Sequence, residues 1–244
     1  MHPEAYVDMA CTESVHWWFR GRRQILDRVI GAMQLPESVR ILEAGSGTGG
    51  NLLMLSRHGS VSAFEMDDNA RKLAAEKTAG RFTLRAGRCP HDIPFADEQF
   101  DLICMFDVLE HIDEDVQTLA ALRHRLAPGG RMLVTVPAYP WLWSAHDVFL
   151  HHKRRYTTRS LQRALAEGGL AIERISYFNM LLLPLAALAR LKDRFMPRQR
   201  SSGTEVPAAP INSALRAIFA SERHLLTRFN LPAGVSLMAI ARAA

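Results

Sequence analysis

A glycine-rich turn at residues 41–50 constrains the fold of this chain more than any other feature. The segment reads Ile-Leu-Glu-Ala-Gly-Ser-Gly-Thr-Gly-Gly, and a second acid, Glu65, closes the next apolar run. Glycines let the backbone turn sharply and approach a ligand closely. Glu65, which follows Val61–Phe64, is placed to accept hydrogen bonds from the hydroxyls of a ribose. The pattern therefore predicts a nucleoside pocket at a strand–turn–helix junction.

Glu43 separates two kinds of nucleoside ligand. Gly45, Gly47 and Gly50 also satisfy the G-x-G-x-x-G spacing of dinucleotide sites, which is weak evidence by itself. A carboxylate directly before the turn would repel a pyrophosphate, but it suits the ammonium group of S-adenosylmethionine (SAM). SAM is therefore the expected cofactor, and an NAD-dependent oxidoreductase is the least favoured interpretation.

Ile41–Gly49 resembles the first motif of the class I SAM-dependent methyltransferases, and the resemblance continues through Phe100–Ile103 and Leu126–Gly130. The chain is also similar to a bacterial branch of small-molecule methyltransferases of types 11 and 12. That branch is marked by His16-Trp17-Trp18-Phe19, Asp107-Val108-Leu109-Glu110-His111 and a Trp-Ser-x-His-Asp…His-x-Arg-Arg-Tyr segment. The resemblance implies the fold and the methyl donor. It leaves the acceptor open, because acceptors vary within the branch.

Length and composition are those of an ordinary globular protein. The 244 residues, 48% of them hydrophobic and 23% charged, suffice for one α/β domain with a modest cap. The N-terminus lacks a basic region followed by an apolar stretch, so we expect no signal peptide. Three isolated cysteines indicate reduced thiols and a cytoplasmic protein.

The net charge of +5 raises the possibility of a nucleic-acid substrate. The basic residues lie in separate clusters, at 20–23, 153–155 and 190–200, and no run interleaves bases with aromatic residues. A single-strand binding groove would need such interleaving. Nucleic acid is therefore a disfavoured partner, and a small molecule is the expected acceptor.

Apolar runs alternate with helical segments along most of the chain. We expect strands over Arg40–Ala44, Val61–Glu65, Phe82–Ala86, Phe100–Phe106, Arg131–Val136, Ala171–Tyr177 and Val235–Ala241. We expect helices over 14–32, from the glycine turn to Arg57, over Asp68–Thr78, Glu114–Leu126, Thr158 to Gly168 and Asn212–Thr227. This alternation predicts a doubly wound, Rossmann-like α/β fold with a mainly parallel seven-stranded sheet. The resemblance implies that the last strand is antiparallel.

Three units are expected. Residues 1–36 form an N-terminal helical lid, 37–178 and 229–244 form the SAM-binding core, and 179–228 form a helical cap with a flexible loop at 197–210. Met180–Ala189 is apolar but too short to span a bilayer. The apolar and then basic segment 180–200 fits an ordinary cap helix, or a surface helix that touches membrane and reaches lipid-linked substrates.

The donor should lie at the carboxyl ends of the strands, where the strand order reverses. Glu43 is expected near its methionine part, Glu65 at the ribose and Met66 on the adenine. Relatives carry an Asp in a Gly-Asp-Ala segment where this chain has Gly87-Arg88-Cys89, so contacts there are open. The predicted cofactor-binding residues are Glu43, Gly45, Ser46, Gly47, Gly49, Glu65, Met66, Arg88, Cys89, Asp107 and Val108.

The acceptor should meet the loop 137–156, which is too long to lack a function. His146, paired with Asp147 or Asp107, is the first candidate for a base, ahead of His152. Trp17 and Trp18 of the 16–19 segment can form an aromatic wall over the cleft that attracts the sulfonium. Arg154 and Arg155 of the loop can bind a carboxylate or phosphate of the acceptor. The predicted substrate-binding residues are His16, Trp17, Trp18, His111, Trp143, His151, Arg154, Arg155 and Tyr156.

Glu110 and His111 raise the question of a metal. In similar quinone O-methyltransferases an equivalent Glu-His pair helps to hold a divalent cation. Two adjacent residues cannot make a metal site alone, because a hard ion needs several oxygen ligands. We therefore interpret them as a helix-start carboxylate and an orienting histidine, and we expect no metal ligand.

These observations together favour transfer of a methyl group from SAM to an oxygen, or a nitrogen, of a small molecule, with release of S-adenosylhomocysteine. A SAM-binding accessory or regulatory protein with an inactive acceptor site is the non-enzymatic alternative. A lipid-linked or nucleic-acid substrate is the alternative within the same chemistry. The sequence is compatible with a monomer or a homodimer.

Overall fold

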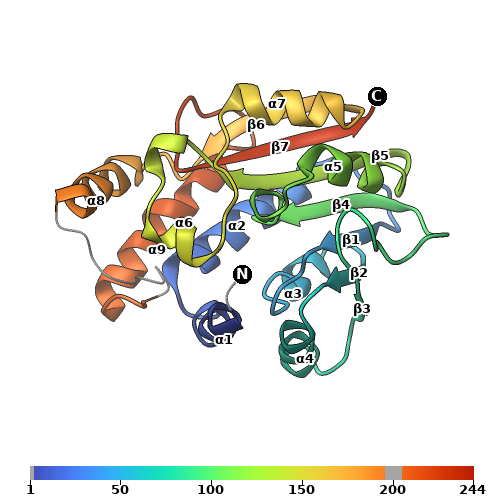
Figure 1. Cartoon of the computed structure of the whole chain (residues 1–244), viewed down its shortest axis with the longest axis horizontal. Helices are drawn as coiled ribbons and strands as arrows, with labels where there is room; N and C mark the ends of the chain where they lie inside the picture. Colours follow the sequence, from blue (N-terminus) through green and yellow to red (C-terminus); the bar gives the residue numbers. More distant parts are fainter. Residues whose placement is uncertain (1–2, 196–204) are drawn as a thin grey trace.

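A seven-stranded sheet with strand order β3-β2-β1-β4-β5-β7-β6 organises the computed structural model, which describes residues 3–195 and 205–244 (Figure 1). β7 pairs antiparallel with β5 and with β6, and the other neighbouring strands are parallel. The strands are β1 Arg40–Ala44, β2 Ser60–Glu65, β3 Thr83–Ala86, β4 Phe100–Phe106, β5 Leu126–Pro137, β6 Leu170–Phe178 and β7 Ser236–Ala243. The predicted Rossmann-like sheet with an antiparallel last strand is confirmed.

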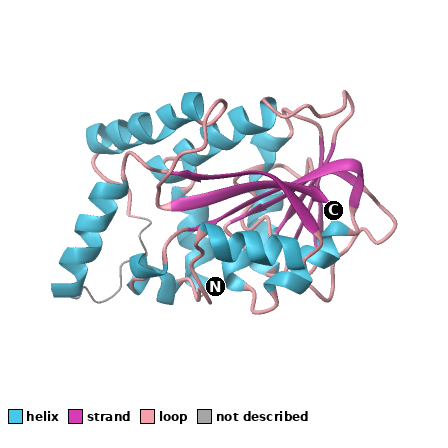
Figure 2. Ribbon diagram, turned by 90° about the horizontal axis from the view of Figure 1, so that it is seen from above, coloured by secondary structure: helices cyan, strands magenta, loops and turns pink. Residues whose placement is uncertain are grey.

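Helices cover both faces of this sheet, as the view from above shows (Figure 2). Those within the described residues are α1 Pro3–Thr12, α2 Trp17–Gly31, α3 Leu52–Leu55, α4 Asp68–Lys77, α5 Asp115–Arg123, α6 Ala145–Phe149, α7 Thr158–Glu167, α8 Leu183–Phe195 and α9 Ala209–Leu225. Two single-turn 3₁₀ helices, η1 Leu109–His111 and η2 Pro140–Leu142, follow β4 and β5. Within the ranges that the structure describes, no helix is both long and apolar enough to cross a membrane.

The alternation of side chains along the central strands explains the two helical layers. In β1, Ile41 points to a core shared with α2, α3 and α9, whereas Leu42 points to a core shared with α5 and α7. Successive strand residues face opposite sides of a sheet, so a strand covered on both sides must be apolar throughout. β4 meets this demand: Asp101 is its one residue that is not fully buried.

Strand order reverses between β1 and β4, which are neighbours in the sheet although β2 and β3 separate them in sequence. The carboxyl ends of β1, β2, β4 and β5 therefore meet at one edge. Open parallel sheets bind ligands at such an edge. Glu65 ends β2 and Asp107 follows β4, so these two predicted site carboxylates lie there.

Several local expectations were wrong. The helix after the glycine turn covers only Leu52–Leu55, because residues 46–51 form tight turns. α1 was not predicted, and β5 begins at Leu126 rather than Arg131. The long loop at 137–156 contains η2 and α6. Of the expected flexible loop, residues 197–204 lie outside the described residues, and α9 already begins at Ala209.

The predicted lid segment has two parts with different surroundings. α1 packs against α4 beside the carboxyl edge of the sheet. α2 packs along α9, and its buried residues Ile25, Leu26, Val29 and Ile30 belong to the core on that face of the sheet. Phe219 of α9 is fully buried where the helices meet, stacked on Phe178 and in edge contact with Trp17. The α2–α9 contact is thus part of the hydrophobic core.

We predict that Phe219→Ala lowers the free energy of unfolding by about 3–5 kcal/mol, because it empties a fully buried aromatic site. Phe229→Ala is the matched control, since Phe229 is 62% exposed, and it should change stability by no more than about 0.5 kcal/mol. Urea unfolding of both variants measures the difference. Similar midpoints for the two variants would show that α2 and α9 do not share a core.

Candidate active site

A chamber of about 1280 Å³ opens at the carboxyl edge of the sheet. Its walls come from α1 and α2, the turns after β1, β2 and β4, the 141–155 segment and α8. Pockets for a single small molecule usually measure about 300–1,000 Å³. The chamber therefore has room for two ligands side by side.

The glycine turn forms one end of the chamber. The amide groups of Gly45 and Ser46 both donate to the carbonyl oxygen of Phe64, at 2.9 and 3.1 Å, which fixes the turn against β2. Gly45 has φ +74°, and a Cβ there would lie 2.8 Å from the methyl groups of Val108. Only glycine therefore allows the turn after β1 to touch the turn after β4.

Glu65 is buried and surrounded by donors. Its Oε2 accepts from the Gly47 amide at 2.9 Å. Its Oε1 accepts from the amides of Met66 and Asp67 at 2.9 and 3.0 Å, and from the Tyr6 hydroxyl of α1 at 3.3 Å. Burial and the nearby Glu65 raise the pKa of Tyr6 above its ordinary value, so the phenol remains a donor. A ribose hydroxyl would have to take the place of Tyr6 or share Oε1 with it.

Glu43 lies beneath the turn rather than in the chamber wall. It is 1% exposed, and its Oε1 accepts from Asn51 Nδ2 at 2.8 Å. Burial raises the pKa of Glu43 to about 7, although Asn51 partly offsets the shift. This carboxyl therefore titrates near neutral pH, and any effect on a bound ammonium group acts through the turn. Gly49 likewise lies outside the lining.

Arg88 and Cys89 line the chamber where an adenine is expected. The Arg88 backbone is held by paired hydrogen bonds with Asp92, at 2.7 and 2.8 Å. Burial, followed by the charge of Glu65, raises the pKa of the Cys89 thiol to about 12. Cys89 therefore presents a neutral thiol, while Met66, 62% exposed, borders the opening.

Glu13 lies between α1 and α2 and links this part of the chain to the glycine turn. Its Oε1 accepts from the Thr48 hydroxyl at 2.8 Å and pairs with Lys77 of α4. A Cβ at residue 50 would lie 2.0 Å from Glu13 Oε2, so the contact requires Gly50. The sequence analysis missed Glu13, because an isolated acid before a helix carries no visible signal.

Arg22 is a second residue that was missed. It pairs with Asp107, and its guanidinium lies 4.5 Å from the ring centroid of Trp18. In sequence it belongs to the basic cluster at 20–23, which gives no hint of a buried partner. The Trp-Trp pair of residues 17 and 18 and His16 all line the chamber, and His16 also caps α2 by accepting from the Trp18 amide at 3.2 Å.

Backbone strain gathers at this edge. Asp107, Tyr139, His151 and Asn179 are non-glycine residues with φ between +55° and +59°. Three of them, Asp107, His151 and Asn179, line the chamber. Such conformations cost free energy and tend to persist at functional sites. The strain supports placing the reacting groups here.

The far wall of the chamber is built around Asp147, which is fully buried in α6. Asp147 Oδ1 lies 2.9 Å from His152 Nδ1 and accepts from Arg155 Nε at 2.7 Å, while Oδ2 accepts from the Ser144 amide at 2.8 Å. Burial disfavours the charge, but the hydrogen bonds from His152 and Arg155 outweigh it and hold the pKa of Asp147 below its usual range. Asp147 thus orients His152 and Arg155 and does not itself line the chamber.

Three other histidines lie near His152. His146, His151 and His111 also line the chamber. The rings of His146 and His111 lie 6.3 and 4.6 Å from that of His152, centroid to centroid. Burial, followed by the proximity of His152, lowers the pKa of His111 to about 3. His111 is therefore neutral at physiological pH.

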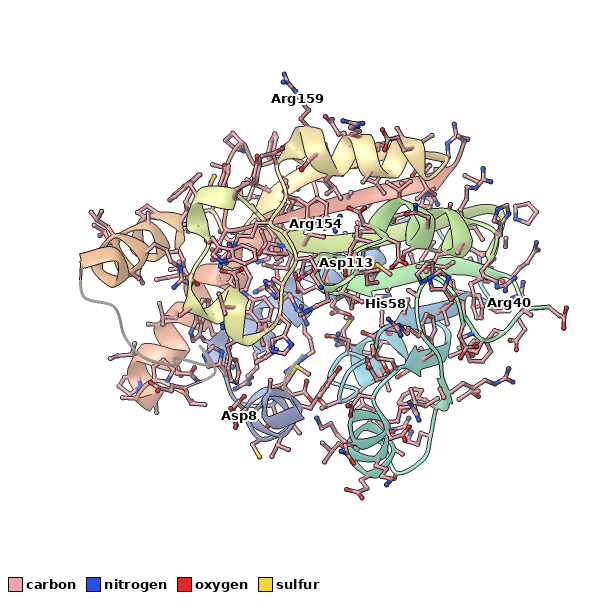
Figure 3. The ribbon with its side chains drawn as sticks, in the orientation of Figure 1. Asp8, Arg40, His58, Asp113, Arg154 and Arg159 are labelled. Carbon is pink, nitrogen blue, oxygen red and sulfur yellow. The ribbon has the colours of Figure 1, made fainter. Side chains whose placement is uncertain are left out.

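Arg154 and Tyr156, predicted to bind substrate, lie outside the lining. Arg154 pairs with Asp115 at 2.7 Å and donates to the Asp113 carbonyl at 2.9 Å. Arg154 and Asp113 are labelled close to each other in Figure 3. The Tyr156 hydroxyl donates to the same Asp115 carboxylate at 2.8 Å. These contacts link the loop 137–156 to the start of α5. Both side chains therefore point away from the chamber.

The remaining predicted site residues are brought together in the lining. They are Gly45, Ser46, Gly47, Glu65, Met66, Arg88, Cys89, Asp107 and Val108 on the donor side, and His16, Trp17, Trp18, His111, Trp143, His146, His151, His152 and Arg155 on the acceptor side.

We predict that Glu65→Gln raises the dissociation constant for S-adenosylhomocysteine about 10- to 100-fold, because a charged acceptor is lost from the ribose position. Glu76→Gln, on the exposed side of α4, is the control and should leave the constant unchanged. Isothermal titration calorimetry compares the two. Equal affinity of the two variants for S-adenosylhomocysteine would show that Glu65 does not belong to the donor site.

Comparison with known proteins places the chain in a family. The methyltransferase-domain family matches residues 16–175. The ubiquinone/menaquinone biosynthesis C-methyltransferase UbiE of Geotalea daltonii is 33% identical over 104 residues, which are 39% of this chain and 44% of that protein. UbiE of Bordetella avium is 24% identical over 180 residues, 62% of this chain and 70% of that protein. The chain thus spans less than half the length of the first relative.

Solved structures agree with the fold. A chain in the complex between the Haloferax volcanii Trm112 methyltransferase activator and a methyltransferase superposes with a TM-score of 0.63, at 16% identity, over 98% of this chain and 93% of that one. Together with the match over residues 16–175, these findings show that the chain belongs to the class I SAM-dependent methyltransferases and that its cofactor is S-adenosylmethionine.

Proposed function

We propose that the enzyme transfers the methyl group of SAM to an oxygen, or a nitrogen, of a small-molecule acceptor. The observation that carries this proposal is the single chamber that joins the donor turn to a wall of imidazoles. Gly47 and Glu65 line one part of it, and His146, His152 and Arg155 line another. A methyl group bound over the turn can therefore face a nucleophile held by the polar wall.

Alignment supplies much of the catalysis. The methyl carbon is already activated by the sulfonium, so the protein must hold donor and nucleophile in line, an effect that can contribute about 7–11 kcal/mol. The face of Trp18 can attract the sulfonium cation. Arg22 pairs with Asp107, so this carboxylate is held in place in the chamber wall.

An oxygen nucleophile must also lose a proton. His146 and His152 both line the chamber, and either imidazole can accept it. Asp147 hydrogen bonds to His152 Nδ1, which leaves Nε2 of that ring for the chamber. Arg155, fixed by the same carboxylate, can bind a negative group of the acceptor.

The test is incubation with methyl-labelled SAM and fractionated host metabolites, followed by kinetics on the labelled acceptor. His146→Ala and His152→Ala should lower kcat about 10²–10⁴-fold for an oxygen acceptor, while leaving donor affinity unchanged. His124→Ala, exposed at the end of α5, is the control. Label found only in RNA or protein, or full activity in both variants, would contradict the proposal.

A second feature favours an acceptor with an apolar tail. Leu182, Leu185 and Ala186 of the segment leading into and along α8 line the chamber. Leu185 is also 54% exposed, and its neighbours Leu181, Leu188 and Leu191 are 45%, 63% and 53% exposed. The apolar wall therefore continues from the chamber to the outer surface. We propose that a hydrocarbon chain follows this path and that the exposed residues Leu181, Leu185, Leu188 and Leu191 touch a membrane surface.

We predict that the protein co-sediments with vesicles containing phosphatidylglycerol, because the exposed leucines precede the basic residues of 190–200. The double variant Leu185→Ser with Leu188→Ser should lose this binding. Leu53→Ser removes a leucine that is 47% exposed on α3 and serves as the control. Equal sedimentation of wild type and double variant would contradict membrane binding through these leucines, and it would leave the methyltransferase proposal unchanged.

A further inference from the structure

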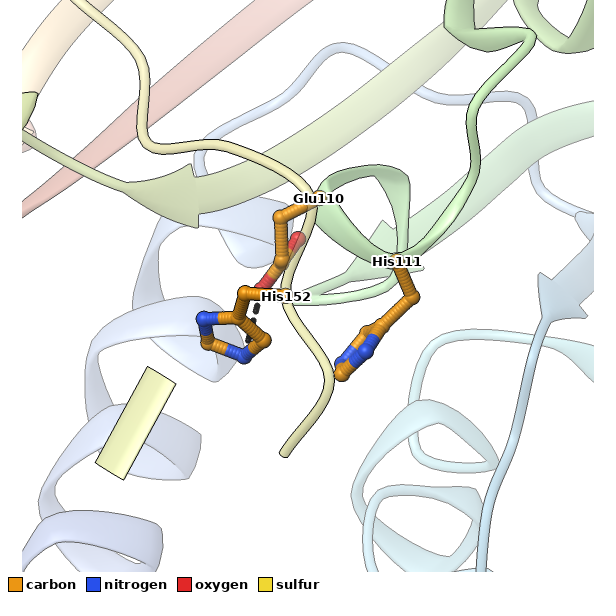
Figure 4. A group of neighbouring side chains, drawn as sticks. All are labelled: Glu110, His111 and His152. Carbon is orange, nitrogen blue, oxygen red and sulfur yellow. Dashed lines mark ion pairs between the residues drawn. The ribbon is translucent and has the colours of Figure 1, made fainter. Parts of the chain in front are cut away.

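We propose that Glu110, His111 and His152 form a binding site for a divalent transition-metal ion in the acceptor wall (Figure 4). Each side chain offers one ligand atom, and these atoms all lie within 4.8 Å of one another. The role of the site in methyl transfer depends on the proposed function, but the binding of the ion does not. The first two residues come from η1, and the third follows α6.

The first argument is a buried carboxylate without a hydrogen bond. Glu110 is 1% exposed, and neither of its carboxylate oxygens has a hydrogen-bond partner in the described part of the chain. Buried polar groups are otherwise hydrogen-bonded or bound to metals. The neighbouring ring of His111 also has an unpartnered Nδ1. Two adjacent ligand atoms are thus left with unsatisfied lone pairs inside the protein.

The second argument is the orientation of His152. Asp147 lies 2.9 Å from Nδ1 of this ring, and Nε2 is directed to Glu110 Oε1 at 4.0 Å. Metal-binding histidines usually donate their other ring N–H to a carboxylate or a backbone carbonyl, which fixes the tautomer. Asp147 supplies such a partner to His152, and the Leu150 backbone hydrogen bonds to the His111 ring. Both imidazoles therefore have the outer support that a ligand needs.

The ligand set selects the kind of ion. Two imidazoles and one carboxylate suit Zn²⁺, Fe²⁺, Co²⁺ or Mn²⁺ and leave coordination positions open, whereas Mg²⁺ prefers an oxygen shell. Ligand atoms around such an ion, at about 2.1 Å from it, lie roughly 3–3.5 Å apart. The observed separations require only a small closure of the three side chains.

The open positions would face the chamber, because all three residues line it. An acceptor with two adjacent oxygen donors could then chelate the ion, and coordination would lower the pKa of its hydroxyl. His146 lines the same chamber and can take that proton in place of His152, which in this arrangement is a ligand. The oxygen electron pair then forms the bond to the methyl carbon as the carbon–sulfur bond breaks, releasing S-adenosylhomocysteine.

The test uses the full-length protein freed of metal by a chelator, with neither donor nor acceptor present. Titration with Co²⁺, read by its visible absorption, and with Zn²⁺, read by calorimetry, should give one ion per chain. His152→Ala and Glu110→Gln should weaken Zn²⁺ binding by at least tenfold. Asp147→Asn, which acts through His152, should weaken it about 10- to 100-fold. Mg²⁺ should not compete.

His91→Ala is the matched control, because His91 and Glu114 form an exposed His–Glu pair with atoms 3.1 Å apart. It should bind Zn²⁺ as the wild type does. If a ligand variant does not fold, as judged by S-adenosylhomocysteine binding, the Co²⁺ spectrum of the wild type decides alone. A wild-type stoichiometry far below one ion, or unchanged affinity in folded His152→Ala and Glu110→Gln, would overturn the site. Either outcome leaves the transfer of labelled methyl groups unaffected.

Discussion

The convergence of negative charge at one edge of the sheet is the constraint on which the rest of the site depends. The reversal of strand order and the close turn at Gly45 bring several carboxylates together in a low-dielectric region, where an unpaired charge is costly. Three of the acids have different partners. Glu65 receives backbone amides, Asp107 pairs with Arg22, and Asp147 is held by Arg155 and a histidine. Glu110 alone among these has no donor within the described residues.

The parts of the fold with strong local signals could be predicted from sequence. β1 and β4 begin and end at the predicted residues, because each is a mainly apolar segment that a turn follows directly. The donor turn was recognisable for the same reason, since its glycines and the acid at the end of β2 are close in sequence. The carboxyl-edge position of Glu65 and Asp107 then follows from the general geometry of parallel sheets.

The parts that depend on contacts between distant segments could not be predicted. Glu13 and Arg22 gain their partners only when the N-terminal segment folds over the glycine turn. His152 contacts Asp147, because the chain leaves α6 and folds back on it. The group formed by His152, Glu110 and His111 joins residues about 40 positions apart, so two neighbouring residues in sequence gave no reason to expect a third ligand.

The aromatic segment at 16–19 serves two purposes at once. Phe19 is buried and Trp17 packs on Phe219, so the segment anchors α2 in the core. Trp18 lines the chamber and lies under the guanidinium of Arg22. A change in this helix therefore alters stability and the active site together.

The contact between Tyr6 and Glu65 has a consequence for the order of events. The phenol of α1 already donates to the oxygen that a ribose hydroxyl would use. Where a ribose hydroxyl takes the place of the phenol at this oxygen, binding of the nucleoside and displacement of Tyr6 from Glu65 are linked equilibria.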